Sequence, residues 1–75
     1  MILTVEQQKS DPGEIAICFD DDGLEFLLKK LSFLKNNDGH LHLMTCSWGG
    51  NELTEIRQGS DDYALVDSLR LVKLR

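Results

Sequence analysis

Leucines in the middle of the chain recur at the spacing of one α-helical face, and this pattern constrains the fold more than any other. The set is Leu24, Leu27, Leu28, Leu31 and Leu34. Intervals of three and four residues place these side chains along a single stripe of a helix. The pattern therefore predicts one amphipathic helix near residues 22–37, with its leucine stripe buried against another layer of the protein.

Residues at both ends of this segment favour the same boundaries. Asp22 stands three positions before Glu25, as in an acidic capping box. The sequence Asn36–Gly39 ends the periodic pattern with residues that stop helices. The consecutive carboxylates of Asp20–Asp22 suit the positive end of a helix, whereas a calcium loop needs ligands alternating over twelve residues.

Strand patterns lie on both sides of the predicted helix. Residues 1–7 and 14–20 are rich in β-branched and apolar types, and Pro12–Gly13 between them favours a reversal. Residues 40–47 and 68–74 also alternate. The order β-β-α-β-β predicts one α+β domain over residues 1–75, with two layers: a mostly antiparallel four-stranded sheet and one helix on one face. Residues 52–63 fit either a short strand or a helical turn.

The alternation assigns the strand side chains to two faces. The face toward the helix carries Leu3, Val5, Ile15, Ile17, Phe19, Leu41, Leu43, Leu69 and Leu71. The far face carries Ile2, Ala16, Cys18, His42, Met44, Cys46, Val72 and Leu74. Because a sheet face in contact with water is normally polar, we expect this apolar far face to be covered by a second copy in a homodimer, by another partner, or by residues 49–67.

The net charge of the chain indicates which kind of partner it can bind. The chain of 75 residues holds 13 acidic and 8 basic residues, for a net charge of −5. The basic residues are scattered along the sequence, whereas a nucleic-acid surface needs clustered lysine and arginine. We therefore expect no nucleic acid and favour a basic protein as the partner.

The apolar segments of the sequence bear on where in the cell the protein is located. No apolar run is long enough to span a membrane, and the chain does not open with a basic segment followed by an apolar stretch. We expect a cytoplasmic protein that makes no membrane contact. Cys18 and Cys46 are then expected to be reduced thiols.

Two histidines and a cysteine are the residues most suited to chemistry. His40 and His42 leave the same face of a strand roughly 6.5–7 Å apart, and Cys46 follows about 13 Å beyond His42. A zinc site needs three or four converging ligands, and a cysteine nucleophile needs a base within hydrogen-bond reach. We expect no enzyme activity, no metal and no cofactor. The alternative is a homo-oligomeric protein that binds a metal or another ligand on the face of His40, His42 and Cys46.

The segment after the third strand pattern is strongly acidic. Residues 48–67 contain five acidic residues and only Arg57 as a base, so their local charge is −4. Both a solvated loop and a recognition surface for a basic partner fit this composition. Trp48, beside the reversal at Gly49–Gly50, fits either a core plug or an exposed anchor of the kind enriched at binding hot spots.

The run from His40 to Leu53, HLHLMTCSWGGNEL, resembles the signature of small immunity proteins from bacterial polymorphic-toxin systems, the immunity-protein family numbered thirty-two. The length of the chain and the order hairpin, helix, motif and C-terminal strand are also similar. The resemblance implies a cytosolic protein that binds and neutralises a toxin made by the same cell. The expected partner-binding residues are His40, His42, Trp48, Asn51, Glu52, Asp61 and Asp62.

Overall fold

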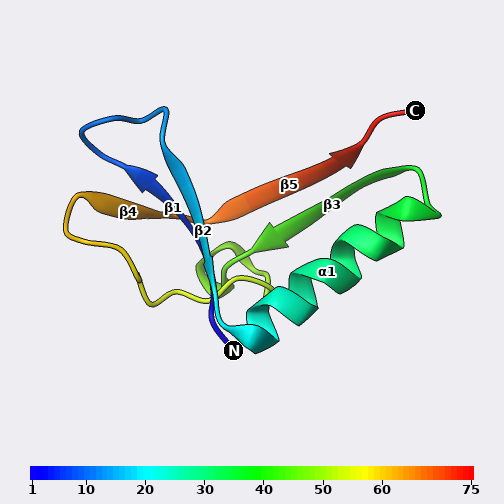
Figure 1. Cartoon of the computed structure of the whole chain (residues 1–75), viewed down its shortest axis with the longest axis horizontal. Coiled ribbons are helices and arrows are strands. Elements are labelled where there is room, and N and C mark those ends of the chain that lie inside the picture. The colour runs from blue at the N-terminus through cyan, green and yellow to red at the C-terminus, as the bar shows by residue number, and fades with distance from the viewer.

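The computed structural model describes all residues, 1–75, as one helix and two small antiparallel sheets (Figure 1). The first sheet has the strand order β2-β1-β4, and the second pairs β3 with β5. The elements in chain order are β1 (Leu3–Gln8), β2 (Ile15–Phe19), α1 (Asp21–Lys35), β3 (Gly39–Met44), the short 3-10 helix η1 (Cys46–Trp48), β4 (Tyr63–Val66) and β5 (Ser68–Lys73).

The α+β class, the single helix and the antiparallel pairing are confirmed, but the single four-stranded sheet is not observed. Residues 49–67 contribute an additional strand, β4, which pairs with β1 in the register Val5 to Val66. Only Asp67 separates β4 from β5, so the chain passes directly from the first sheet into the second. Strand β5 then pairs with β3, with Leu43 opposite Leu69. The sheet is therefore divided at Asp67 rather than continuous.

Helix α1 begins and ends close to the expected boundaries, but its leucine stripe is not buried throughout as expected: Leu34 is buried, whereas Leu24, Leu28 and Leu31 are 37–47% exposed because no layer covers that side of the helix. Its N-cap is Asp20, whose carboxylate accepts a hydrogen bond from the backbone N–H of Gly23 at 2.8 Å. At the other end, the Asn37 amide donates to the Phe33 carbonyl, and Lys73 Nζ donates to the Lys35 carbonyl at 2.8 Å. These contacts satisfy backbone groups that a helix end leaves unpaired. The helix is neither long nor apolar enough to cross a lipid bilayer.

The fully buried core is small and lies where the two sheets meet α1. Four buried side chains form it, and partly buried side chains of α1, β4 and β5 pack around them. The four are Leu3, Val5, Leu43 and Leu53. Of these, Leu53 lies in the segment between η1 and β4, outside every expected strand. The predicted core positions Leu3, Val5 and Leu43 are confirmed.

Strand β2 does not contribute to the core as expected. Ile15, Ile17 and Phe19 share a face with the buried residues of β1, since Phe19 pairs with Leu3 and Ile17 with Val5. Their side chains are nevertheless 40–49% exposed. Strand β2 is an edge strand of the first sheet, and α1 leads away from its end rather than across it (Figure 1).

The expected apolar far face is divided and partly covered. Ala16 and Cys18 lie on the outer face of the first sheet, whereas Met44 and Val72 belong to the second. Residues 53–59 fold back along the first sheet. Thr54 N–H donates to the Leu3 carbonyl at 2.7 Å, and Leu3 N–H donates to Thr54 Oγ1 at 2.9 Å. Of the three possibilities for covering this face, the segment of the chain itself therefore covers part of it.

Candidate functional site

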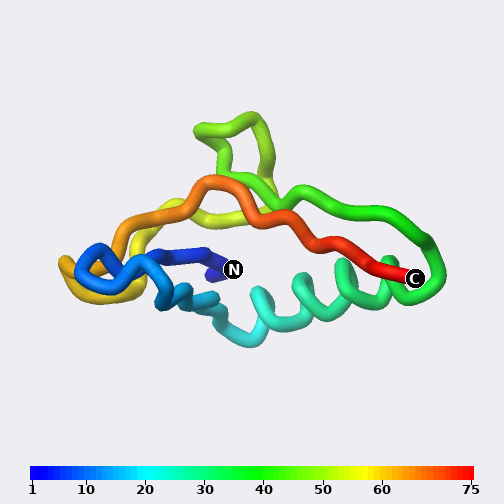
Figure 2. Tube along the Cα trace, turned by 90° about the horizontal axis from the view of Figure 1, so that it is seen from above, coloured from blue at the N-terminus to red at the C-terminus, as the bar shows by residue number.

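The motif-bearing segment forms a protruding loop, residues 45–52. Its base is held by Thr45, which donates its N–H to the Asp67 carbonyl at 3.0 Å and its hydroxyl to the Asp67 carboxylate at 2.9 Å. Asp67 is the residue at which β4 passes into β5, so the same junction fixes the two sheets and the loop. Figure 2 shows the loop projecting from the β3–β5 layer on the side opposite α1.

Both glycines of the loop are required by its geometry. Gly49 ends η1 with φ +86°, a left-handed conformation that residues with a side chain rarely adopt. Gly50 packs so closely that a Cβ would lie 2.6 Å from the Met44 carbonyl oxygen. The expected Gly–Gly reversal is thus present, and its role is structural.

Glu52 also faces inward. Its Oε1 accepts the N–H of Met44 at 3.0 Å, and its Oε2 accepts the N–H of Asn51 at 3.4 Å. The next residue, Leu53, is buried in the core. Glu52, which we expected to contact a partner, therefore holds the end of the loop against the protein.

Replacing Glu52 with alanine should reduce the free energy of unfolding by about 1–2 kcal/mol, because two backbone N–H groups lose a charged acceptor. Glu25→Ala is the matched control, since the Glu25 side chain is exposed and makes no hydrogen bond. Chemical denaturation monitored by circular dichroism measures both. Equal midpoints for the two variants would contradict the structural role of Glu52.

Trp48 is the one large side chain that this loop presents to solvent. It is 61% exposed, which excludes the core plug. Its neighbour Ser47 donates both its N–H and its hydroxyl to the Glu55 carboxylate, at 2.7 Å and 3.0 Å. The indole therefore stands on a hydrogen-bonded loop with an acidic residue beside it, and Asn51 is also exposed.

The two histidines lie together on the outward face of β3. The ring centroids of His40 and His42 are 5.0 Å apart in an edge-to-face arrangement, and both side chains are exposed. Cys46 is exposed in η1 and does not join them. Nowhere in the structure do three histidine, cysteine, aspartate or glutamate side chains converge in a way that suits a metal ion. The histidines are thus an exposed pair on β3, without a third ligand.

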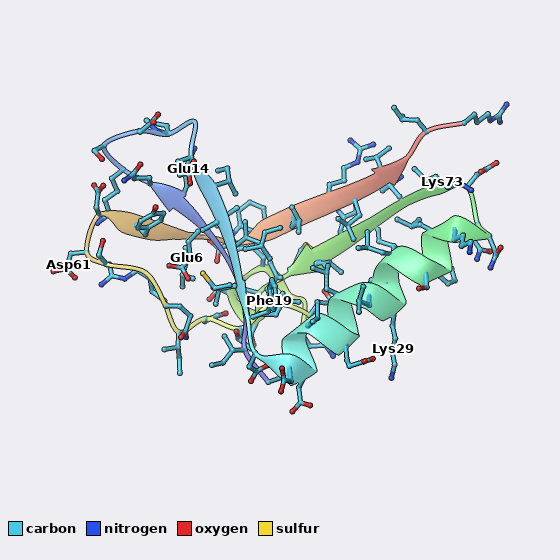
Figure 3. The ribbon with its side chains drawn as sticks, viewed as in Figure 1. Glu6, Glu14, Phe19, Lys29, Asp61 and Lys73 are labelled. Carbon is cyan, nitrogen blue, oxygen red and sulfur yellow. The ribbon has the colours of Figure 1, made fainter.

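Asp61 and Asp62 are separated from the rest of the expected site. Figure 3 shows Asp61 at the end of the molecule opposite Lys73, whereas β3 begins at residues that pair with Lys73. Asp61 forms an ion pair with Arg57 at 2.8 Å. Asp62 accepts hydrogen bonds from the hydroxyl and N–H of Ser10, and the Ser10 hydroxyl is the main reason that the pKa of Asp62 is lowered. Asp62 therefore attaches the segment before β4 to the hairpin, whereas the Asp61 ion pair lies within that segment.

A carboxylate that the sequence patterns did not indicate organises the same segment. Glu6 is fully buried on the outer face of β1. Its carboxylate accepts hydrogen bonds from the Thr4 hydroxyl at 2.6 Å and from the N–H groups of Gln58 and Gly59, each at 2.9 Å. Burial alone would raise the pKa of Glu6, but these hydrogen bonds together outweigh burial and lower it. The only sequence signal is a single acidic residue within an apolar strand.

Charge is strongly polarised along the molecule, in contrast to the scattered distribution expected from the sequence. Residues 26–46 and 68–75, which form most of α1, β3 and β5, contain six basic residues and one acidic residue, a net side-chain charge of +5. The remaining residues contain two basic and twelve acidic residues, a net charge of −10. The basic residues separated in sequence thus gather in one half of the fold, and the protruding loop begins in the basic part of the chain and ends in the acidic part.

Comparison of the chain with protein-family models, with curated proteins and with solved structures finds no match. The candidate site therefore rests on its own geometry and on the motif. Loop 45–52 and the histidines of β3 lie in one continuous stretch of chain, His40–Glu52. Within that stretch His40, His42, Trp48 and Asn51 are exposed, and the other three expected residues have partners inside the protein.

Proposed function

We propose that this chain is a small immunity-type protein that neutralises a bacterial toxin by direct contact, in the cytoplasm and without catalysis. The observation that carries the proposal is the exposed indole of Trp48. The other characteristic residues of the motif, among them Thr45, Gly49, Gly50 and Glu52, have roles in building the loop. A loop fixed by so many internal contacts that still exposes its tryptophan is well suited to anchor a partner.

Electrostatics supports a basic partner. The second half of loop 45–52 belongs to residues 48–67, whose local charge is −4, and the Glu55 carboxylate lies next to the loop at Ser47. Opposite charge accelerates encounter between proteins and is screened by salt. We therefore assign Trp48 to the desolvated centre of the interface, and His40, His42, Asn51 and Glu55 to its margin.

The test is binding and protection against the toxin domain encoded by the neighbouring reading frame. Trp48→Ala should weaken the complex at least about 30-fold, because loss of a hot-spot tryptophan costs 2 kcal/mol or more. Phe33→Ala is the matched control, since Phe33 is an exposed aromatic residue on α1, remote from the loop. Isothermal titration calorimetry measures affinity, and co-expression measures protection.

The outcomes separate the function from the site. Absence of both a complex and protection with the unmodified chain would contradict the proposed function. If Trp48→Ala retains the circular dichroism of the parent and still binds with parental affinity, the assignment of the interface to loop 45–52 is wrong. Equal losses in Trp48→Ala and Phe33→Ala would also contradict that assignment.

A further inference from the structure

A second apolar surface lies on the opposite side of the molecule from loop 45–52. Figure 1 shows that strand β2 and helix α1 diverge from a common end. Figure 3 places Phe19 where the two elements meet. The surface is formed by Ile15, Ile17 and Phe19 of β2 and by Leu24, Leu28 and Leu31 of α1.

These six side chains are neither buried nor freely exposed. Each is between 37% and 49% exposed, so their combined accessible area is on the order of 500 Å², already most of the roughly 800 Å² that each partner contributes to a standard protein interface. Exposed apolar patches of this size mark interaction sites. Strand β2 adds a free sheet edge with the sequence IAICF, which has none of the charges or prolines that usually protect edges.

A groove between α1 and β5 continues this surface. It has a volume of about 440 Å³ and is lined by Leu31, Leu71 and Val72, with Lys35, Arg70 and Lys73 around it. The tip of the hairpin that carries β2 holds Lys9, Asp11 and Glu14, and Ser10 there binds the Asp62 carboxylate, so the tip is acidic overall. The groove is therefore lined by basic residues, and the hairpin tip has the opposite charge.

We propose that the occupant of this surface is a second copy of the chain, in a two-fold dimer in which each β2 arm packs against the α1–β5 groove of its partner. The two-fold arrangement is self-complementary, since the contact between β2 of one copy and the groove of the other occurs twice in the dimer. It pairs the apolar faces and brings the acidic hairpin tip of one copy to Lys35, Arg70 and Lys73 of the other. It also supplies the core that a chain with only nine buried residues lacks.

Sedimentation equilibrium tests the assembly directly. At tens of micromolar protein the mass should be twice that of the 8.5-kDa chain. Ile17→Glu on β2 and Leu28→Glu on α1 should each give the single-chain mass while retaining the circular dichroism of the parent, because both side chains are already partly exposed. Ile56→Glu is the control, since Ile56 is exposed on the segment covering the other face of the first sheet, and it should leave the dimer intact.

Salt and the loop variant provide further checks. Raising sodium chloride from about 50 mM to about 500 mM should weaken the dimer several-fold, since opposite charges at its margin are screened. Trp48→Ala should remain dimeric, which makes this proposal independent of the proposed function. A single-chain mass at all concentrations overturns it. Dimers that survive both Ile17→Glu and Leu28→Glu, or that do not respond to salt, overturn the assigned arrangement.

Discussion

Replacing Glu6 with glutamine should lower the free energy of unfolding at neutral pH by about 2–3 kcal/mol, a large effect for a single isosteric change. The Glu6 carboxylate is fully buried and accepts three hydrogen bonds. A carboxylate only accepts, whereas an amide has one oxygen and one NH₂ group that donates. In the variant, at least one N–H of Gln58 or Gly59 would face another donor.

The consequence should extend beyond Glu6 itself. Gln58 and Gly59 belong to the segment that covers the outer face of the first sheet, and Glu6 is the only side chain that bonds to their N–H groups. Loosening this contact exposes that segment to solvent. Hydrogen exchange of the Gln58 and Gly59 amides should therefore increase more than exchange within α1, in proportion to the local opening.

The effect should also depend on pH in a defined direction. The pKa of Glu6 is lower in the folded protein than its ordinary value of 4.5. The ionised group therefore contributes its full stability above about pH 4.5, and this contribution is lost as the pH falls through the folded-state pKa. Glutamine does not titrate, so the difference between parent and Glu6→Gln should narrow on acidification.

Urea unfolding at pH 7 and at pH 3 measures both effects. Glu25→Gln is the matched control, because Glu25 is exposed and its side chain forms no hydrogen bond. A Glu6→Gln protein with the parental midpoint at pH 7, or a stability difference that widens in acid, would contradict the role of the Glu6 carboxylate in holding Gln58 and Gly59.

The sequence was sufficient for features that depend on local periodicity. The leucine spacing predicts a helix over residues 22–37, and α1 spans Asp21–Lys35. The alternating segments correspond to β1, β2, β3 and β5. Periodicity reports which side chains share a face, however, and not whether another layer covers that face. Alternation therefore predicts Ile17 in the core, although β2 is an uncovered edge strand.

Features that depend on contacts between distant residues were not predictable in this way. Strand β4 has only four residues, and its pairing with β1 is set by tertiary structure. The division into two sheets depends on Asp67 and its hydrogen bonds to Thr45, which is 22 positions away. Glu6 appears in the sequence as an ordinary polar position on a strand, and only the covering segment makes it a buried acceptor.

The candidate site shows the same limit. Composition indicated an acidic segment and a tryptophan, and the structure leaves Trp48 exposed on a fixed loop. Glu52, Asp61 and Asp62 look equivalent to other acidic residues in the sequence. Each has a partner within the protein, and for Asp62 that partner, Ser10, is 52 positions away in the sequence.

Gly23→Ala should destabilise the protein by about 3 kcal/mol, although alanine is the better helix former by about 1 kcal/mol. Gly23 lies in the first turn of α1 and is buried against the start of the chain. A Cβ at this position would overlap the Ile2 carbonyl oxygen and approach the Ile2 carbonyl carbon to 2.9 Å and Phe19 Cβ to 3.1 Å. Two of these atoms are backbone, so no change of side-chain rotamer relieves the overlap.

Relief requires the chain at Ile2 to move, and that movement has a further cost. The Ile2 carbonyl accepts the N–H of Asp20 at 3.2 Å, and the next residue, Leu3, pairs with Phe19 and belongs to the core. Gly13→Ala is the control, because its Cβ would meet only the Asp11 carboxylate, at 3.4 Å. Thermal unfolding should show a lower midpoint for Gly23→Ala alone. A Gly23→Ala protein at least as stable as the parent would mean that helix propensity outweighs this contact, and would contradict the packing of α1 against Ile2.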